Sequence, residues 1–351
     1  MTRIAIDAMG GDYAPHEIIA GAVWAAYEYN VPIELVGKQK DIEVELNKIK
    51  QSGFISDCGN KGSKKHIKVN ISQLDIKITD AQEVIGMGEH PGQALRKKKK
   101  SSIVLAVKSV ADGTSDAVVA AGSTGAAMAA SLFGLGRIAG ITRPAICVTL
   151  PSLNKHVVVI DGGANAECTS EMLYQFAIMG SLFSKHILGV KNPRIGVLNI
   201  GEEDTKGNTL AQETHKLLDK NKDKFNFIGN IEGKDLLLDS CDVVVCDGFV
   251  GNVTLKVTEG TASLLFKLIK KEFQSSIFGG MVGMMAKRFL KNIYAKINYE
   301  EYGGMLLLGV NGVTVISHGR SKAYAIKNAV RVAKEAVETG LNKKITEFIQ
   351  K

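Results

Sequence analysis

The chain has 351 residues and is 45% hydrophobic, so it is long enough to bury either one large α/β core or two smaller ones. Its 37 glycines beside only 6 prolines indicate tight strand–helix turns rather than a collagen-like or disordered chain. The net charge of +8 favours an acidic partner such as nucleic acid, an anionic membrane or an acidic carrier protein, although ordinary surface charge explains it equally well.

The N-terminus and the cysteines predict a cytosolic protein. Residues 1–12 lack the apolar stretch of a signal peptide, and no run of about 18 apolar residues occurs in the chain. The cysteine count is odd and no pair has CxxC spacing, which argues against a disulfide framework or a zinc site. We therefore expect a reducing compartment and no metal; the five cysteines are Cys58, Cys147, Cys168, Cys241 and Cys246.

Short β-branched runs recur along the chain with helical stretches between them. Most are continuously apolar, which is typical of strands covered on both faces in a largely parallel sheet. Since no repeat or clear linker interrupts the pattern, we expect a single three-layer α/β/α domain over residues 1–351. The predicted strands are 3–7, 33–36, 67–71, 117–120, 145–149, 157–161, 194–199, 225–228, 242–246 and 313–316.

Seven of these strands lead into glycine-rich turns. The carboxyl ends of parallel strands share one edge of a sheet, where ligands bind at turns that feed helix N-termini. Glycine lets the backbone approach such a ligand closely. We therefore expect a site for a small anion at that edge, formed by the turns AMGGD, AGSTGA, GGANAE, IGEEDTKGN, GNIEG, DGFVGNV and SHGR.

Two polar stretches lie outside this pattern. Residues 51–68 are rich in Gly, Lys and Ser and predict a surface loop. The basic run at 96–100 is either a solvated helix face or a dock for an acidic protein or phosphate tail. No aromatic residue interleaves with this run, which argues against nucleic acid. The candidate docking residues are Arg96, Lys97, Lys98, Lys99 and Lys100.

The segment 260–300 differs from the rest and predicts a protruding helical element. Within 275–297, apolar residues recur at four-residue steps, which marks one apolar helix face. That face fits a core or dimer-interface helix, and it also fits an amphipathic helix lying on an anionic membrane. Methionine suits either role because it repacks easily. The candidate membrane residues are Ile277, Phe278, Met281, Met285 and Phe289.

The turns carry the candidate catalytic residues. No P-loop, GxSxG elbow or HExxH motif is present, which argues against nucleotide hydrolysis, serine hydrolysis and zinc peptidase chemistry. Lys206 and Asn165 could donate to an oxyanion or phosphate. Aspartates in the positions of Asp161 and Asp247 more often cap turns and helices than take part in chemistry. His318 could be an acid, a base, an anion donor or a structural histidine.

Taken together and in order, the motifs resemble the PlsX family, the acyl-(acyl carrier protein):phosphate acyltransferases of bacterial phospholipid synthesis. The resemblance runs from Arg3 to about Val337 and depends on no single motif. It rests on IAIDAMGGDYAP, AGSTGA, RPA, DGGAN, QFAIMGS, GEEDTKGN, FIGNIEG, DVVVCDGFVGNVTLK, YGGMLLLGV and HGRS.

The resemblance implies transfer of an acyl group from acyl carrier protein to inorganic phosphate. It implies a fold similar to phosphotransacetylases and isocitrate-dehydrogenase-like enzymes, with no metal or nucleotide cofactor. It also implies a homodimer at the inner face of the cell membrane, which supplies a downstream membrane acyltransferase and binds no nucleic acid. Because acyl carrier protein is acidic, the resemblance favours docking at 96–100; because the product is a lipid, it favours membrane contact by 275–297.

Phosphate is already an anionic nucleophile at neutral pH, so this chemistry needs positioning and oxyanion stabilisation more than activation. Ser123 stands where many relatives have Asn, which keeps a donor but shortens its reach. We expect Lys206, Asn165, His318 and Asp161 to be catalytic. The expected substrate and phosphate contacts are Gly10, Gly11, Asp12, Gly122, Ser123, Thr124, Gly125, Gly163, Asp247 and Asn252.

Two alternatives stay open. One is a phosphate acyltransferase that uses a coenzyme A thioester in place of the carrier. The other is a non-catalytic scaffold for lipid enzymes on the membrane.

Overall fold

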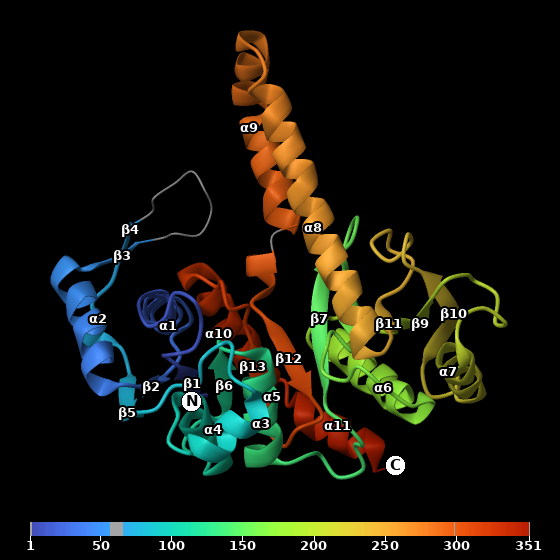
Figure 1. Cartoon of the computed structure of the whole chain (residues 1–351), viewed down its shortest axis with the longest axis horizontal. Helices are drawn as coiled ribbons and strands as arrows, with labels where there is room; N and C mark the ends of the chain where they lie inside the picture. The colour runs from blue at the N-terminus through green and yellow to red at the C-terminus, as the bar shows by residue number, and fades with distance from the viewer. Residues whose placement is uncertain (1, 57–65, 298, 351) are drawn as a thin grey trace.

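A computed structural model of the chain describes residues 2–56, 66–297 and 299–350. Eleven strands form one sheet in the order β10-β9-β11-β8-β7-β12-β13-β6-β1-β2-β5, and helices pack on both of its faces (Figure 1). The predicted α/β fold with a largely parallel sheet is therefore confirmed.

The N-terminal half of the sheet is parallel throughout. Its strands pair along their lengths in one direction, with Ile4 beside both Ile33 and Ala117, and Ile316 beside Ala120. These strands are β1 (Ile4–Asp7), β2 (Ile33–Gly37), β5 (Ile76–Asp80), β6 (Ala117–Ala120) and β13 (Val313–Ile316).

The other half runs in the opposite direction. The strands β8 (His156–Ile160), β9 (Arg194–Asn199), β10 (Asn226–Glu232) and β11 (Val243–Val245) are parallel to one another. Two antiparallel neighbours, β7 (Ala145–Pro151) and β12 (Met305–Leu308), join them to the first half. The expectation that all glycine turns share one edge is therefore wrong, because each half places its carboxyl ends at its own edge.

The helices form two layers around buried apolar side chains. One face of the sheet is covered by α1 (His16–Tyr29), α2 (Gln39–Ser52), α6 (Ser170–His186), α7 (Thr209–Lys220), α10 (Ala323–Glu338) and α11 (Leu341–Ile349). The other is covered by α3 (Pro91–Lys97), α4 (Ser102–Ala111), α5 (Thr124–Leu135) and the first turns of α8 (Gly248–Phe273).

Most of the predicted strands are present, some at the predicted bounds, but two strands of the main sheet were missed. These are β5, which lies at an edge of the sheet, and β12, which directly follows Gly303 and Gly304. The GNIEG turn is also wrong, because Gly229 lies inside β10. In the polar segment 51–68, β3 (Phe54–Ser56) and β4 (His66–Lys68) pair as a small separate sheet, while 57–65 lie outside the described residues.

A helical hairpin stands away from the sheet (Figure 1). It consists of α8 and α9 (Ile277–Ile297), followed by a short 3-10 helix, η2 (Tyr299–Tyr302); another, η1 (Ile71–Gln73), precedes β5. The two long helices meet through Phe266 and Tyr294, whose ring centroids lie 5.3 Å apart. Near the tip a Cβ on Gly283 would lie 3.0 Å from Phe273, so glycine allows the close approach. No residue of α9 is buried.

Candidate active site

Three glycine turns meet at the carboxyl edge of β1, β6 and β13. The Asp12 amide donates to Gly319 O at 2.8 Å, and the Ser317 amide donates to Ala120 O at 2.8 Å. A Cβ on Gly10 would lie 2.9 Å from the Gly122 amide nitrogen, so only glycine fits there. We call these turns, 8–12, 121–125 and 317–320, the first turn group.

A buried carboxylate organises the first turn group. Asp7 is 4% exposed, and its Oδ1 accepts a hydrogen bond from the Met9 amide at 3.2 Å. Burial raises the pKa of Asp7, and hydrogen bonds from Ser102 and from the Met9 and Gly10 amides oppose that rise. Sequence reasoning missed Asp7 as a site residue, although an acidic residue that ends an apolar strand was the available signal.

Helix α5 begins in the first turn group. Ser123 is its N-cap and accepts from the Ala126 amide at 3.4 Å. Thr124 and Gly125 form the first turn, where amide hydrogens have no partner within the helix. The fold thus brings together the residues predicted for phosphate: Gly10, Gly11, Asp12, Gly122, Ser123, Thr124 and Gly125.

The second turn group comprises residues 161–165 and 247–252, after β8 and β11. Asp161 is fully buried and accepts hydrogen bonds from the amides of Ile146, Gly163, Ala164 and Asn165 at 2.8–3.1 Å. Burial raises the pKa of Asp161, and these hydrogen bonds oppose the rise. Asp161 therefore holds the shape of the turn.

Asn165 is already fully engaged as a donor. Its Nδ2 donates to Asp161 Oδ2 and to Pro144 O, both at 2.8 Å. Since an amide group has two N–H donors, none is left for an oxyanion. Its predicted role as an oxyanion donor is revised to one of positioning, because it ties the turn to the start of β7.

The remaining predicted residues of this group lie at the start of α8. Asp247 is the N-cap, and its Oδ1 accepts from the Val250 amide at 2.9 Å. A Cβ on Gly163 would lie 3.4 Å from Cβ of Asn252. Asn252 thus stands over the turn held by Asp161.

Helix α8 connects the two turn groups. Its Gly251 packs on Asp161 O, where a Cβ would approach to 1.9 Å, and Leu255 contacts Gly162. One turn further, Lys256 pairs with Glu259 at 2.8 Å. These two charges also act on His318 of the first turn group. The sequence analysis missed Lys256, although it follows Asn252 by four residues and shares its helix face.

The surroundings of His318 lower its pKa and so favour the neutral imidazole. Burial lowers its pKa, the positive charge of Lys256 lowers it further, and Glu259 opposes this. Its Nδ1 accepts from the Arg320 amide at 3.1 Å, which puts the proton of the neutral ring on Nε2.

Lys206 lies in the loop between β9 and α7. Its side chain is 49% exposed, and Nζ stands 4.0 Å from Glu203 Oε1, a weak pairing. The loop is shaped by Asn199, whose Nδ2 donates to Lys206 O at 3.1 Å, and by Asn208, the N-cap of α7. A φ of +86° and contact with Asn199 make glycine necessary at Gly207.

The basic run at 96–100 contains four exposed residues and one, Lys98, that is engaged within the fold. Arg96, Lys97, Lys99 and Lys100 are exposed. Lys98 instead donates to Val84 O at 2.8 Å and to Glu89 at 2.6 Å, so it holds the preceding loop. Lys98 is therefore removed from the predicted docking surface.

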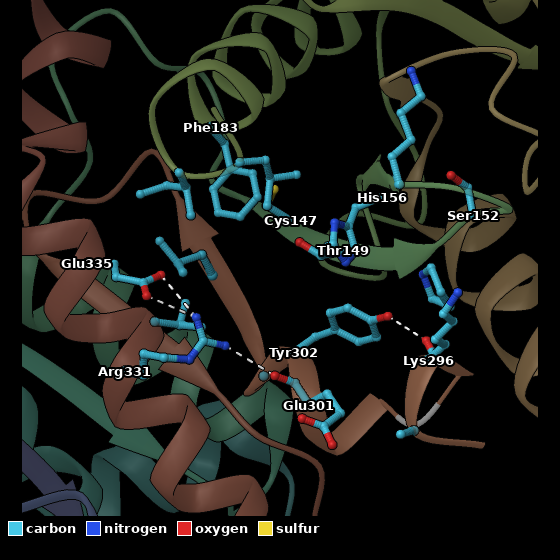
Figure 2. A pocket seen from close by; sticks show the side chains of 18 of the residues that line it. Cys147, Thr149, Ser152, His156, Phe183, Lys296, Glu301, Tyr302, Arg331 and Glu335 are labelled. Atoms are coloured by element: carbon cyan, nitrogen blue, oxygen red, sulfur yellow. Dashed lines mark hydrogen bonds and ion pairs between the residues drawn. The ribbon is translucent and has the colours of Figure 1, made fainter. Parts of the chain in front are cut away.

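A separate pocket of about 740 Å³ lies on the sheet face covered by α6 and α10 (Figure 2). Phe183 and Cys147 stand on one side of it, and Tyr302, Glu301 and Arg331 on another. It contains none of the predicted site residues and lies across the sheet from α8. Its size alone does not make it the active site.

The four cysteines in the described residues, Cys147, Cys168, Cys241 and Cys246, are free thiols. Burial raises the pKa of each of them. An activated thiolate nucleophile is therefore not present among them. Cys58 lies outside the described residues.

Comparison with known proteins gives both sequence and fold relatives. Residues 2–344 match the family profile described as "Fatty acid synthesis protein". The chain is 49% identical to a phosphate acyltransferase of Halothermothrix orenii, covering 99% of each chain. It is also 49% identical to a phosphate acyltransferase of Desulforamulus reducens, covering 100% of this chain and 98% of that one.

Solved structures with a similar fold have low sequence identity. A phosphotransacetylase from Streptococcus pyogenes aligns at a TM-score of 0.62 and 14% identity, covering 96% of this chain and 94% of that one. A 4-hydroxythreonine-4-phosphate dehydrogenase from Klebsiella pneumoniae aligns at 0.52 and 12%, covering 96% and 99%. At such identities the likeness concerns the fold alone.

Proposed function

The chain belongs to the fatty acid synthesis protein family and is a phosphate acyltransferase, and from this premise we propose that it transfers a fatty acyl group from the thioester of acyl carrier protein to inorganic phosphate. The observation that carries the proposal is the path of α8. It begins over the turn held by Asp161 and passes His318, so one helix lines both turn groups. Two substrates, an anion and a thioester, need two such adjoining sets of donors.

The reaction needs no covalent enzyme intermediate. A phosphate oxygen attacks the thioester carbonyl carbon, and the carbonyl oxygen becomes a tetrahedral oxyanion. Collapse breaks the C–S bond, giving acyl phosphate and a thiolate, which takes up the proton that the attacking hydrogen phosphate loses. Positioned donors stabilise the oxyanion, and removing one typically costs about 100- to 1,000-fold in rate.

We assign phosphate to the start of α5. The amides of Thr124 and Gly125, the Ser123 cap and the packed glycines at 10–11 and 122 form a cradle that admits close approach. The partial positive charge of a helix N-terminus favours an anion there. The phosphate would then lie on the His318 side of α8.

The cationic and titratable groups take the remaining roles. Lys206, which is half-exposed and weakly paired, is assigned to the developing oxyanion. The lowered pKa of His318 favours a neutral ring with its proton on Nε2, which suits a hydrogen bond to the departing sulfur. Asp161 and Asn165 position the second turn group without touching the reacting atoms.

Acyl carrier protein is the proposed donor because the exposed basic residues fit an acidic partner. Arg96, Lys97, Lys99 and Lys100 surround the end of α3, and Pro91 at its start packs on Gly125 of the proposed phosphate cradle. A carrier bound there would stand beside the first turn group. Charge complementarity of this kind acts mainly on encounter and on register.

The test is an assay of purified protein with a long-chain acyl carrier protein thioester, with and without inorganic phosphate. We expect acyl phosphate and free carrier only when phosphate is present. Thioester loss without phosphate dependence would contradict the proposal.

The donor is tested by comparing carrier and coenzyme A thioesters. Arg96→Glu with Lys97→Glu is expected to raise KM for the carrier thioester about tenfold and to leave KM for the coenzyme A thioester unchanged. Equal effects on both donors, or faster turnover of the coenzyme A thioester by the unmodified protein, would favour the coenzyme A alternative.

Localisation is proposed as cytoplasmic, with peripheral contact at the inner face of the cell membrane. In the described part of the chain, no helix combines the length and apolar character needed to cross a bilayer. The hairpin of α8 and α9 is the proposed contact, and a second copy of the chain is the proposed partner along it. Such contact would deliver acyl phosphate near a membrane acyltransferase.

A further inference from the structure

A smaller pocket, of about 330 Å³, opens where β9 and β11 end. Three helices, α6, α7 and α8, begin around it, with Thr169, Asn208 and Asp247 as their N-caps. Its walls are apolar and come from all of these elements. They include Leu173, Val197, Leu210, Ala211, Val245 and Val250.

The interior of the pocket is lined by buried apolar side chains, while its mouth is polar. Leu173, Val197 and Val245 are at most 2% exposed. The neighbouring Cys246 thiol stays protonated, because burial and the nearby charge of Asp247 raise its pKa. At the mouth stand Asn208 and Asp247, which cap α7 and α8. An occupant therefore has an apolar body and a polar end.

The mouth also adjoins the proposed chemistry. Gly207 and Asn208 line the pocket and directly follow Lys206. Ile200, on the same loop, is 81% exposed although it lines the pocket. If a ligand covered the Ile200 side chain, the burial of its apolar surface would stabilise the complex by about 25 cal/mol per Å² removed from water.

We propose that this pocket binds the hydrocarbon tail of the acyl substrate, with the thioester carbonyl at the mouth between Lys206 and the start of α8. The inference rests on the proposed function, since it assigns the tail of that reaction's substrate. The pocket of Figure 2 is larger, but it lies toward the other end of α6, beside Phe183, and contains no catalytic candidate. Only the smaller of these two pockets therefore lets the tail bind while the thioester carbonyl stays beside Lys206.

The proposal predicts that narrowing the pocket changes chain-length selectivity. Ala211→Phe on α7 and Val250→Phe on α8 each place a ring in it, from two different helices. We expect the ratio of kcat/KM for a long-chain over a short-chain acyl thioester to fall at least about tenfold, since a single misfit methylene in an apolar pocket changes discrimination by about 10- to 200-fold.

Glu213→Phe is the matched control, because it adds the same ring to an exposed position of α7 outside the pocket. It should leave the ratio unchanged. If both narrowing variants fold and keep the unmodified ratio, the proposal is overturned. If the unmodified protein forms no acyl phosphate at any chain length, the proposed function fails instead.

Photolabelling of the unmodified protein gives an answer that needs no variant. A long-chain acyl thioester with a diazirine at the chain end should label peptides of α6, α7 or the first turns of α8. Labelling confined to the pocket around Phe183 and Tyr302 would overturn the proposal.

Discussion

At the scale of residues, two buried aspartates do the same work in the two halves of the sheet. Asp7 and Asp161 each follow an apolar strand and gather backbone amides of the next turn. A carboxylate buried in this way is an acceptor and a scaffold, and its desolvation is offset by those hydrogen bonds. The sequence predicted Asp161 through its motif, whereas the one signal for Asp7, an acidic residue at the end of an apolar strand, was not used.

Lys206→Ala is predicted to lower kcat for acyl phosphate formation by about 100-fold or more, because the developing oxyanion loses a cation. The melting temperature should stay within a few degrees, since the side chain is about half-exposed and its pairing with Glu203 is long. Lys216→Ala on the exposed side of α7 is the control and should change neither quantity. Near-normal turnover by Lys206→Ala would remove its assigned role.

The pH profile tests His318. Because its pKa is lowered by burial and by Lys256, the imidazole stays neutral below the ordinary range near 6.5. The second proton adds to Nδ1 and leaves Nε2–H in place, but Nδ1 then no longer accepts from the Arg320 amide. We therefore predict activity that persists as pH falls through 6.5 and declines at lower pH, where the ring loses that positioning hydrogen bond. Phosphate itself titrates near neutrality, so the profile of His318→Gln, which keeps an N–H donor, is the reference.

We expect His318→Gln to lose the low-pH decline and to retain more activity than His318→Ala. A decline that is identical in the unmodified protein and in His318→Gln would mean that another group titrates. In that case His318 has a structural role.

At the scale of elements, the helical hairpin exposes large apolar side chains to solvent. Ile277, Phe278, Met285 and Phe289 are 70–89% exposed, and Leu264, Leu265 and Leu268 of α8 are 52–55% exposed. Apolar patches of this extent mark contact with a protein or a membrane. Residues near the tip are the candidates for membrane, and those along the shaft are the candidates for a second copy.

Replacing Met281, Met285 and Phe289 with serine should abolish co-sedimentation with vesicles that contain anionic lipid, because the apolar face that would enter the interface is lost. Light scattering should still report a dimer if the shaft residues of α8 form that contact. Replacing Leu264 and Leu268 with serine is the converse variant and should yield monomers. Unchanged vesicle binding by the triple variant would leave the hairpin a purely dimeric role.

The strands also show how much of the secondary structure could be predicted from the sequence. Apolar runs at 117–120, 194–199 and 313–316 have the same bounds in the structure because both of their faces are covered. Strand direction was misjudged at β7 and β8, which are joined by a four-residue turn at 152–155. A connection that short cannot hold a crossover helix, so it requires an antiparallel pair. The strand β5 was missed because it lies at a sheet edge, where none of its residues is fully buried and its sequence lacks the continuous apolar run of the central strands.

At the scale of the whole molecule, the reversed half-sheet explains why site residues so far apart in the chain adjoin. Each half presents its own helix N-termini, and α8 begins at the second turn group and carries Lys256, whose charge acts on His318 of the first. Sequence motifs supplied the members of each turn group, but their division depends on strand direction. Which amide hydrogens are already engaged, as in Asn165, depends on side-chain geometry that no motif encodes.

The same helix sets a distance. At about 1.5 Å per residue, the 26 residues of α8 extend about 39 Å from the second turn group to the tip of the hairpin. If the tip rests on a bilayer with the helix upright, acyl phosphate forms at about that height above the lipid. In that orientation the hairpin is a spacer between the turn groups and the bilayer. Transfer of the product to the membrane then requires either that the molecule tilts or that acyl phosphate is released into the water layer between them.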